Sequence, residues 1–286
     1  MANSISLFKV YTPLLDEVYK KESLTSKLDT ASDLIRYTQG SRQVYVNKMT
    51  LQGLADYSRT SGYVGGEATL TQEMKEMNYE RGRMFSIDAM DNEETAGIAY
   101  GRLAGEFSRS YVVPEIDSVR FATYASKAGT HPADDTLSAG EWYGKVSEAW
   151  TTLTENEVPE NDRHLFLTAK GYEDILNKSL TDSKVFFDMF ASVTVVPQSR
   201  FYESVTLASS GAGGYSRTTG ANNINFMVIY KPAVIQVLKH QDVKVITPQA
   251  NQDADAWKFG YRVYGLNDVY DNKVKGIYLH TSEVTA

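Results

Sequence analysis

The first forty residues combine short apolar clusters with polar runs. Leu14, Leu15 and Val18 are spaced as on one face of a helix, within sequence rich in Lys, Glu, Ser and Thr. The stretch is too short and too polar to form a core of its own. We therefore expect an arm that lies on another surface.

From residue 41 to residue 87 the pattern is that of a long two-stranded ribbon. The first strand is marked by apolar side chains at Val44, Val46, Met49 and Leu51. A glycine-punctuated turn region follows, and the mostly polar stretch 67–83 returns the chain. Because an isolated hairpin is only marginally stable in water, this ribbon needs a neighbouring surface, which can belong to another subunit.

The next segment carries the clearest helical pattern of the chain. Asp91 followed by Glu94 resembles a capping box. Apolar residues then recur on one face at Ala96, Tyr100, Leu103, Phe107 and Tyr111. Pro114 interrupts this helix but suits the first turn of a new one, which we predict over 115–128.

The second half of the chain mixes helices with a series of strands. A third helix is predicted from Ser138 and Glu141 through Leu153, and Thr168 caps a fourth after a short buried strand at 165–167. Further strands are predicted at 193–196, 224–230, 243–246, 259–264 and 276–280, and the glycine-rich stretch 209–220 is predicted to be a flexible loop. The fold class is therefore α+β, with one long helix and an extended ribbon.

Composition excludes several classes of protein. The 286 residues include no cysteine, which excludes disulfides and thiolate metal sites and fits assembly in a reducing cytoplasm. No apolar run approaches the ~20 residues of a membrane-spanning helix, and the first residues do not form a signal peptide. The formal net charge of −7 does not favour a protein whose main role is to neutralise phosphates.

No pattern of residues predicts an enzyme, a cofactor site or a metal site. The run 211–214 (GAGG) lacks the Lys and Ser/Thr of a phosphate-binding loop, and the four histidines are scattered. Asp253 and Asp255 match no calcium loop. The acidic cluster at Asp88, Asp91, Glu93 and Glu94 is better explained by the preference for acidic residues in the first turn of a helix than by acid–base catalysis.

Several segments, in this order, are similar to motifs of the major capsid proteins of tailed bacteriophages. They are 53–59 (GLADYSR), 62–66 (GYVGG), 80–88 (ERGRMFSID), 91–95 (DNEET), 113–117 (VPEID) and 195–201 (VVPQSRF). The resemblance covers most of the chain. Each motif is moderately specific, and their order is more so.

The resemblance implies a Hong Kong 97-like (HK97-like) capsid fold. Its expected divisions are an N-terminal arm (1–40), an E-loop ribbon (41–90), a P-domain with a spine helix (91–135, the spine at about 91–112), a region that is mainly A-domain (136–255), and C-terminal strands that return to the P-domain (256–286). The implied function is a structural head protein, which self-assembles into hexamers and pentamers of an icosahedral shell around double-stranded DNA.

The resemblance also implies partners and contact residues. The expected partners are further copies of the chain, a separate scaffolding protein (favoured by the start at Met1), a portal protein, an optional decoration protein, and packaged DNA contacted without sequence specificity; no membrane is involved. The shell would assemble in the host bacterial cytoplasm and form part of the virion. Candidate inter-subunit contacts are Tyr57, Arg59, Gly62, Tyr63, Gly65, Gly66, Arg81 and Arg83. Lys48 and Lys75 lie on the predicted ribbon, where some relatives carry a cross-linking lysine, but we expect both to be ordinary solvated lysines.

Three alternatives remain open from the sequence. An encapsulin-like cargo shell would use the same fold. A soluble hydrolase would use the acidic cluster around Asp91 and Glu94. A tail-tube protein would form stacked rings, although the long helix predicted after the ribbon argues against it.

Overall fold

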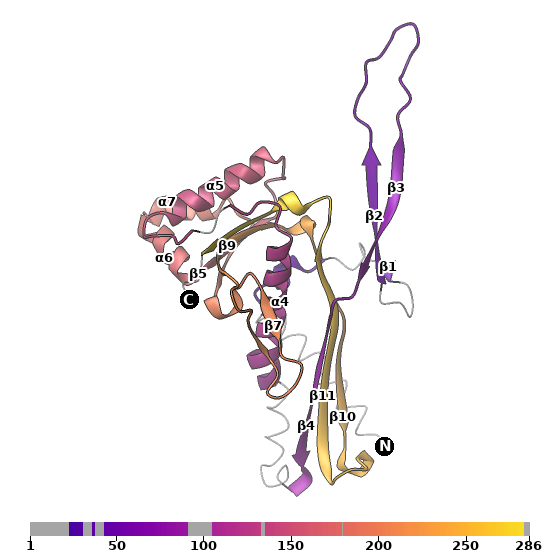
Figure 1. Cartoon of the computed structure of the whole chain (residues 1–286), viewed down its shortest axis with the longest axis vertical. Coiled ribbons are helices and arrows are strands. Elements are labelled where there is room, and N and C mark those ends of the chain that lie inside the picture. The colour runs from indigo at the N-terminus through magenta and orange to yellow at the C-terminus, as the bar shows by residue number, and fades with distance from the viewer. Residues whose placement is uncertain are drawn as a thin grey trace.

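The computed structural model describes residues 23–30, 36–37, 43–90, 105–132, 135–178 and 180–282. Most of the predicted arm lies outside these residues. So does the helix predicted from Asp91, except for its last turns. The described residues form an elongated body from which a ribbon extends (Figure 1).

The ribbon is formed by β2 (Gln43–Leu51) and β3 (Ala68–Glu76), which are antiparallel. The short strand β1 (Arg36–Tyr37) pairs with β2 at the base of the ribbon. β2 and the turn region follow the prediction, but the return strand does not. It ends at Glu76, and the rest of the stretch predicted to return the chain leaves the ribbon as β4 (Tyr79–Asp88).

β4 belongs to a second, three-stranded sheet in the order β10-β11-β4. β10 (Val234–Ile246) and β11 (Ala256–Val269) form a long antiparallel pair, and β4 pairs with β11 from Tyr79↔Gly265 to Asp88↔Ala256. β4 lies in this sheet because its alternate side chains Tyr79, Phe85 and Ile87 pack into an apolar cluster against the central helix, which is described next. The predicted strands 243–246 and 259–264 are thus parts of much longer strands.

The central helix runs without a break through the position of Pro114. Residues 105–107 are helical, a π-helical stretch spans Ser108–Val112, and α4 spans Val113–Ser126. At the junction the N–H of Val113 reaches back to the carbonyl of Ser108. The predicted interruption at Pro114 is therefore wrong, although Pro114 does lie in the first turn of α4, where its missing N–H is tolerated.

A third sheet, in the order β12-β9-β5-β6, separates two apolar cores. Its strands are β12 (Ile277–Ser282), β9 (Asn223–Tyr230), β5 (Arg163–Thr168) and β6 (Ser192–Val196). Along β9, Phe226 and Val228 pack against the helices on one face, whereas Met227 and Ile229 pack towards α4 on the other. Burial on both faces explains why these strands are continuous apolar runs in the sequence.

Three helices cover the outer face of this sheet: α5 (Trp142–Glu155), α6 (Ala169–Lys178) and α7 (Leu180–Phe187) (Figure 1). α5 and α6 were predicted, and Glu141 accepts the backbone N–H of Ser138 at 2.7 Å, as one half of a capping box requires. α7 was not predicted. It lies in the crossover between β5 and β6, which are parallel and so need a long connection.

A small hairpin lies beside α4. It consists of β7 (Val205–Leu207) and β8 (Tyr215–Arg217). The stretch 209–220, predicted to be a loop throughout, is therefore a loop only in part, since β8 falls within it. Short 3-10 turns lie at Ser26–Leu28, Gln198–Arg200, Lys231–Ala233, Pro248–Ala250 and Val274–Gly276.

Candidate subunit-contact site

The ribbon has one apolar face, which is defined by its register. Residues paired across an antiparallel ribbon project from the same face. The pairs Met49↔Leu70 and Leu51↔Ala68 are apolar and share their face with Met74. Four of these side chains are largely exposed: Met49 (63%), Leu51 (64%), Leu70 (61%) and Met74 (50%). This surface is referred to below as the apolar ribbon face.

The opposite face of the ribbon meets the body at its base. Val44 is fully buried against Ile235, Val237 and Leu266 of β10 and β11. Val44 pairs with Lys75, so both side chains point towards the body. The ribbon is thus anchored at one end only, and it extends away from the body beyond this point (Figure 1).

The tip of the ribbon brings together six of the eight predicted contact residues. Tyr57, Arg59, Gly62, Tyr63, Gly65 and Gly66 all lie in the loop 52–67. Ser58 and Gly62 close a tight turn, in which the N–H of Gly62 donates to the carbonyl of Ser58 at 2.7 Å. Gly62 has φ +80°, a conformation that favours glycine. Their contacts with another subunit stay a prediction.

Large apolar side chains protrude from this tip. Leu54 is fully exposed and Tyr63 is 89% exposed. The rings of Tyr57 and Tyr63 meet edge to face with their centroids 4.9 Å apart, which holds the tip together. Exposed apolar surface of this extent is unusual for a surface that only meets water, and it is typical of interaction sites.

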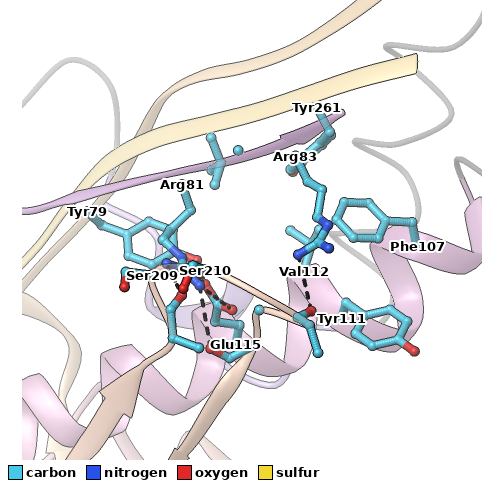
Figure 2. A pocket seen from close by; sticks show the side chains of 16 residues that line it. Tyr79, Arg81, Arg83, Phe107, Tyr111, Val112, Glu115, Ser209, Ser210 and Tyr261 are labelled. Atoms are coloured by element: carbon cyan, nitrogen blue, oxygen red, sulfur yellow. Dashed lines mark hydrogen bonds and ion pairs between the residues drawn. The ribbon is translucent and has the colours of Figure 1, made fainter. Parts of the chain in front are cut away.

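Arg81 and Arg83, the other two predicted contact residues, lie far from the tip, on β4. There they bind the loop between β7 and β8 within the same chain (Figure 2). The guanidinium of Arg81 donates to Glu115 Oε1 at 2.8 Å and to the carbonyl of Ala208 at 2.8 Å. Arg83 donates to the carbonyls of Gly211 (2.9 Å) and Ala212 (3.1 Å). The structure thus gives both arginines an intramolecular role, and their contact with another subunit stays a prediction.

Glu115 is the buried centre of this arrangement. It accepts the hydroxyl of Tyr79 at 3.0 Å as well as Arg81. Burial, together with the neighbouring charge of Glu115, raises the pKa of Tyr79, and the hydrogen bond to Glu115 raises the pKa of Arg81. Tyr79 thus stays a neutral donor and Arg81 a cation, so both hold the carboxylate of Glu115.

A cavity of about 110 Å³ lies between β4, the π-helical stretch and the loop 208–214 (Figure 2). Its wall includes the aromatic rings of Phe107, Tyr111 and Tyr261. The guanidinium of Arg81 at its edge is already bound by Glu115, Ala208 and Gly214. This arrangement fixes the glycine-rich loop against the sheet and does not provide an anion site.

Lys75 is not the solvated lysine that we expected. Its side chain is only 11% exposed, and its Nζ lies 2.6 Å from Glu73, 2.8 Å from Asp271 and 3.5 Å from Asp268. Burial lowers its pKa, but the hydrogen bonds to Asp271 and Glu73 outweigh this effect and raise the pKa overall. The side chain of Lys48 lies outside the part that the structure describes.

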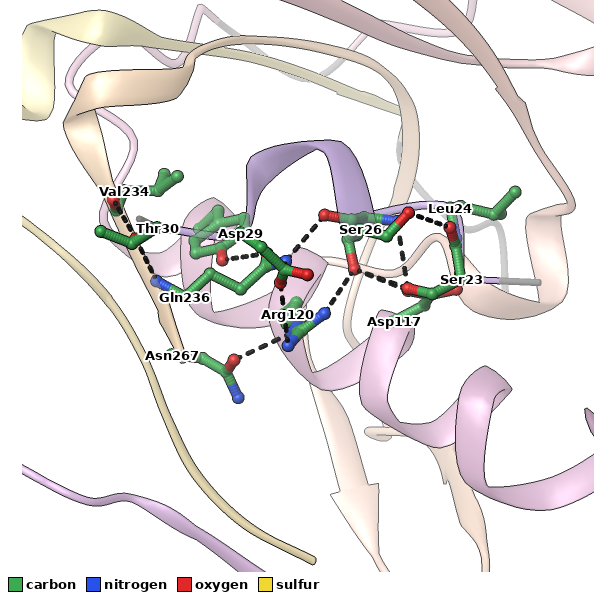
Figure 3. Close-up of polar contacts among 12 residues, drawn as sticks. Ser23, Leu24, Ser26, Asp29, Thr30, Asp117, Arg120, Val234, Gln236 and Asn267 are labelled. Atoms are coloured by element: carbon green, nitrogen blue, oxygen red, sulfur yellow. Dashed lines mark hydrogen bonds and ion pairs between the residues drawn. The ribbon is translucent and has the colours of Figure 1, made fainter. Parts of the chain in front are cut away.

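A buried polar network, which the sequence did not reveal, holds residues 23–30 on α4 (Figure 3). Asp117 accepts the hydroxyls of Ser23 (2.8 Å) and Thr25 (2.7 Å) and the N–H of Leu24 (3.0 Å). Gln236 donates to the carbonyl of Thr25 at 2.7 Å. This segment connects α4 to β10 and fixes where the chain enters the body.

The acidic and histidine candidates do not converge on a site among the described residues. Asp88 accepts the backbone N–H of Met90 at 2.9 Å, which is a capping interaction, while Asp91, Glu93 and Glu94 lie outside the described residues. In the described part of the chain, no three His, Asp or Glu side chains form a group that could hold a metal. Within the same ranges, no helix is long and apolar enough to cross a membrane.

The chain was compared with known proteins. No protein-family profile and no curated protein sequence matches it. Solved structures do match. A structure described as a virus-like particle from Pyrococcus furiosus has a TM-score of 0.62 at 12% identity, covering 96% of this chain and 99% of the other. The capsid structure of cyanophage P-SCSP1u has a TM-score of 0.57 at 14% identity, covering 90% and 87%.

The mature capsid of bacteriophage PhiM1 has a TM-score of 0.59 at 9% identity, covering 86% of this chain and 83% of the other. Agreement over almost the whole of each chain, at such low identity, is agreement in fold. The chain therefore has the mixed helix-and-sheet fold of phage capsid structures, as the resemblance in its sequence predicts.

Proposed function

We propose that this chain is the major capsid protein of a tailed bacteriophage. In this role it is a non-enzymatic subunit that assembles into the hexamers and pentamers of an icosahedral shell around double-stranded DNA. The single observation that carries the proposal is the ribbon, which presents an apolar face and an apolar tip that the described part of the chain leaves exposed. The shared fold supports the same role.

A ribbon with uncovered apolar side chains is unfavourable in water. Each Å² of apolar surface removed from water contributes about 25 cal/mol, so covering side chains such as Leu70 and Met49 favours association. We propose that the ribbon docks on another copy of the same chain. Such head-to-tail contacts repeat from copy to copy, and they close into rings when the rotation between copies permits it.

The partners expected from the sequence fit this role, but we propose different divisions. β4 leaves the expected E-loop (41–90), β10 leaves the expected A-domain (136–255), and β12, expected to return to the P-domain (256–286), joins the A-domain sheet. We propose that residues 43–76 act as the E-loop ribbon, that the β10-β11-β4 sheet with α4 forms the P-domain, and that the β12-β9-β5-β6 sheet with α5, α6 and α7 forms most of the A-domain. A separate scaffolding protein, a portal, an optional decoration protein and non-specifically contacted DNA are proposed partners. Assembly would take place in the bacterial cytoplasm and end in the virion.

Electron microscopy of the purified protein, alone and co-expressed with a scaffolding protein, tests the proposal. We expect closed icosahedral particles or isolated five- and six-fold rings. Replacing Leu70 by Ser on the apolar ribbon face should reduce particle formation without changing the stability of the subunit. The matched control is Thr69→Ser, an exposed neighbour on the other face of the ribbon, which should assemble normally. A chain that stays monomeric under every condition would refute the proposal.

A phage shell is favoured over an encapsulin-like cargo shell because similar solved structures come from phages of several different hosts. Nuclease-protected DNA in purified particles would support the phage shell, and particles that fill with a protein cargo instead would support the alternative.

A further inference from the structure

The apolar ribbon face can meet a neighbour only if the ribbon projects at the right angle, so its attachment to the body matters. Several contacts of the described residues form this attachment. Val44 packs on β10 and β11, and the two residues between β3 and β4, Met77 and Asn78, connect the ribbon to the body. Beyond them, the charged cluster around Lys75 joins the two parts.

Asn78 has the geometry of a pivot. Its side chain donates to the carbonyl of Asn267 at 2.6 Å and accepts the N–H of Asn267 at 3.1 Å. This pair of hydrogen bonds continues the ladder between β4 and β11 by one step, using a side chain in place of the backbone. The body is thus rigid up to Asn78, and the ribbon begins two residues before it, at Glu76.

The charges around Lys75 come from both sides of this pivot. Glu73 and Lys75 belong to the ribbon, whereas Asp268, Asp271 and Lys127 belong to the body. Lys75 binds Asp271 at 2.8 Å and Asp268 at 3.5 Å. Lys127, next to the end of α4, pairs with Asp268. Without Lys75, the ribbon's Glu73 would face the two body carboxylates without the cation that binds all three.

We propose that Lys75 is an electrostatic latch that sets the angle of the ribbon, and that the ribbon pivots about Asn78 when the latch opens. With Lys75 present, the charges of ribbon and body attract each other. With its charge removed, Glu73 repels Asp268 and Asp271, because like charges at short range disfavour one another. The sign of the net force between ribbon and body therefore depends on the charge of Lys75.

This inference rests on the proposed function, since it concerns the regulation of the surface that would join neighbouring copies. An adjustable ribbon lets identical copies meet neighbours at slightly different angles, as hexamers and pentamers of one shell require. The latch itself is a property of the single subunit, so it can be measured separately from assembly.

The absence of cysteine makes the measurement direct. Two exposed positions, Glu67 at the end of the ribbon loop and Glu155 at the end of α5, are replaced by cysteine in the full chain and spin-labelled. The distance distribution is then recorded on unassembled subunits. We expect a narrow distribution for the otherwise native chain and a broader, shifted one for Lys75→Gln. The double variant Glu73→Gln/Lys75→Gln should return towards the native distribution, because the repulsion is removed.

Salt provides a second test, which acts on the variant more than on the native chain. Screening at 1 M ionic strength shortens the reach of charges to ~3 Å and affects partly buried pairs least. It should narrow the distribution of Lys75→Gln, where carboxylates repel, and change the native distribution little, because Lys75 is largely buried and its ion pairs are short. The matched control is Lys258→Gln, which removes an ion pair with Asp253 on the body. It should show the native distance distribution at low and at high salt.

Asp271→Asn serves as a milder variant, because this side chain is 62% exposed and its replacement should not disturb folding. It should shift the distribution in the same direction as Lys75→Gln and to a smaller extent. If Lys75→Gln and Asp271→Asn both keep the native distribution while shells still form, the latch is refuted and the proposed function stands. If the distributions change as expected but no shells or rings form, the latch stands as a property of the subunit and the proposed function fails.

Discussion

Asp117 and Arg120 lie one turn apart on α4, carry opposite charges and have no exposed surface, and both bind Thr25. Asp117 accepts the hydroxyl of Thr25 at 2.7 Å, and Arg120 donates to the same oxygen at 2.9 Å (Figure 3). Buried charges are tolerated only when they are paired and hydrogen-bonded. One short segment thus hydrogen-bonds to two of the three buried charges of the central helix.

Asp117→Ala should release residues 23–30 from α4. The variant leaves the hydroxyls of Ser23 and Thr25 and the N–H of Leu24 without their acceptor. We expect the free energy of unfolding to fall by about 3 kcal/mol, since each hydrogen bond to a charged group contributes about 1.5–3 kcal/mol and the losses are not additive. Chemical denaturation measures the loss, and faster tryptic cleavage at Lys27 reports the release.

The control for this experiment is Asp253→Asn, which removes an exposed carboxylate paired with Lys258. Its denaturation midpoint and its cleavage at Lys27 should match those of the native chain. Equal stability of Asp117→Ala and the native chain would contradict the role given to this network.

Arg81→Met should destabilise the protein and loosen the loop 208–214. The methionine keeps the length of the side chain but leaves the buried Glu115 with Tyr79 alone, and it removes the donor to Ala208. We expect a loss of about 2 kcal/mol in the free energy of unfolding, typical of a buried polar group that loses its partner. Hydrogen exchange of residues 208–214 should become faster.

Arg262→Met is the matched control for Arg81→Met. Arg262 lies on β11 opposite Gly82 and pairs with Glu80 at the surface, where its side chain is 65% exposed. Because exposed ion pairs contribute only about 0–1 kcal/mol, the change in stability should be small. A loss as large as that of Arg81→Met would show that the loop contacts have no special role.

Acid should destabilise the β12-β9-β5-β6 sheet through His280. This ring is buried, stacks on Phe226 and accepts the amide of Asn225 at 3.1 Å. Burial is the main cause that lowers its pKa; the charge of Lys145 lowers it further, whereas those of Asp135 and Glu148 act in the opposite direction. The folded chain therefore binds a proton less readily than the unfolded chain, whose histidine has a pKa of about 6.5.

The contribution of His280 to the free energy of unfolding should thus be fully present above about pH 6.5 and should be lost progressively as the pH falls below this value. Denaturation between pH 7.5 and pH 5 measures this slope, and His280→Phe should reduce it. Lys258→Gln, which removes an ion pair on β11, is the control and should retain the native slope. An unchanged slope in His280→Phe would contradict the prediction.

Two glycines should respond to the same substitution in opposite directions. A Cβ on Gly171 of α6 would lie 2.3 Å from the ring of Trp142, whereas a Cβ on Gly144 of α5 would meet nothing within 4 Å. We expect Gly171→Ala to cost about 1–3 kcal/mol through overpacking. Gly144→Ala should stabilise the chain by up to about 1 kcal/mol, because alanine favours the helix. Thermal denaturation of the two variants tests both signs.

The sequence predicted those elements that are specified by residues close together in the chain. Spaced apolar residues located α5, with Trp142, Val146 and Leu153 in the core, and the apolar run at 165–167 located β5. Pro114 marked the start of α4. These elements are specified by residues within one or two turns of each other, which explains why the sequence alone revealed them.

The elements that were missed depend on distant partners. Nothing near Tyr79 indicates that β4 pairs with Gly265 rather than with the ribbon, and the lengths of β10 and β11 follow from their mutual pairing. Asp117 and Arg120 look like surface residues in the sequence, because only the folded chain brings Thr25 to them. The six tip residues lie together because they are close in the sequence, but their role as contacts comes from the resemblance and stays a prediction. The intramolecular partners of Arg81, Arg83 and Lys75 were not predicted, since these partners are remote in the sequence.

The alternation of side chains along the ribbon restricts how its length can change. Met49 and Leu70 share a face because they are paired in register, and the period of a strand is two residues. An insertion of one residue in β2 or β3 would turn every side chain beyond it to the opposite face. The ribbon can therefore grow or shrink among related proteins in steps of two residues on both strands, and an odd step must be absorbed by the loop 52–67 or by a bulge.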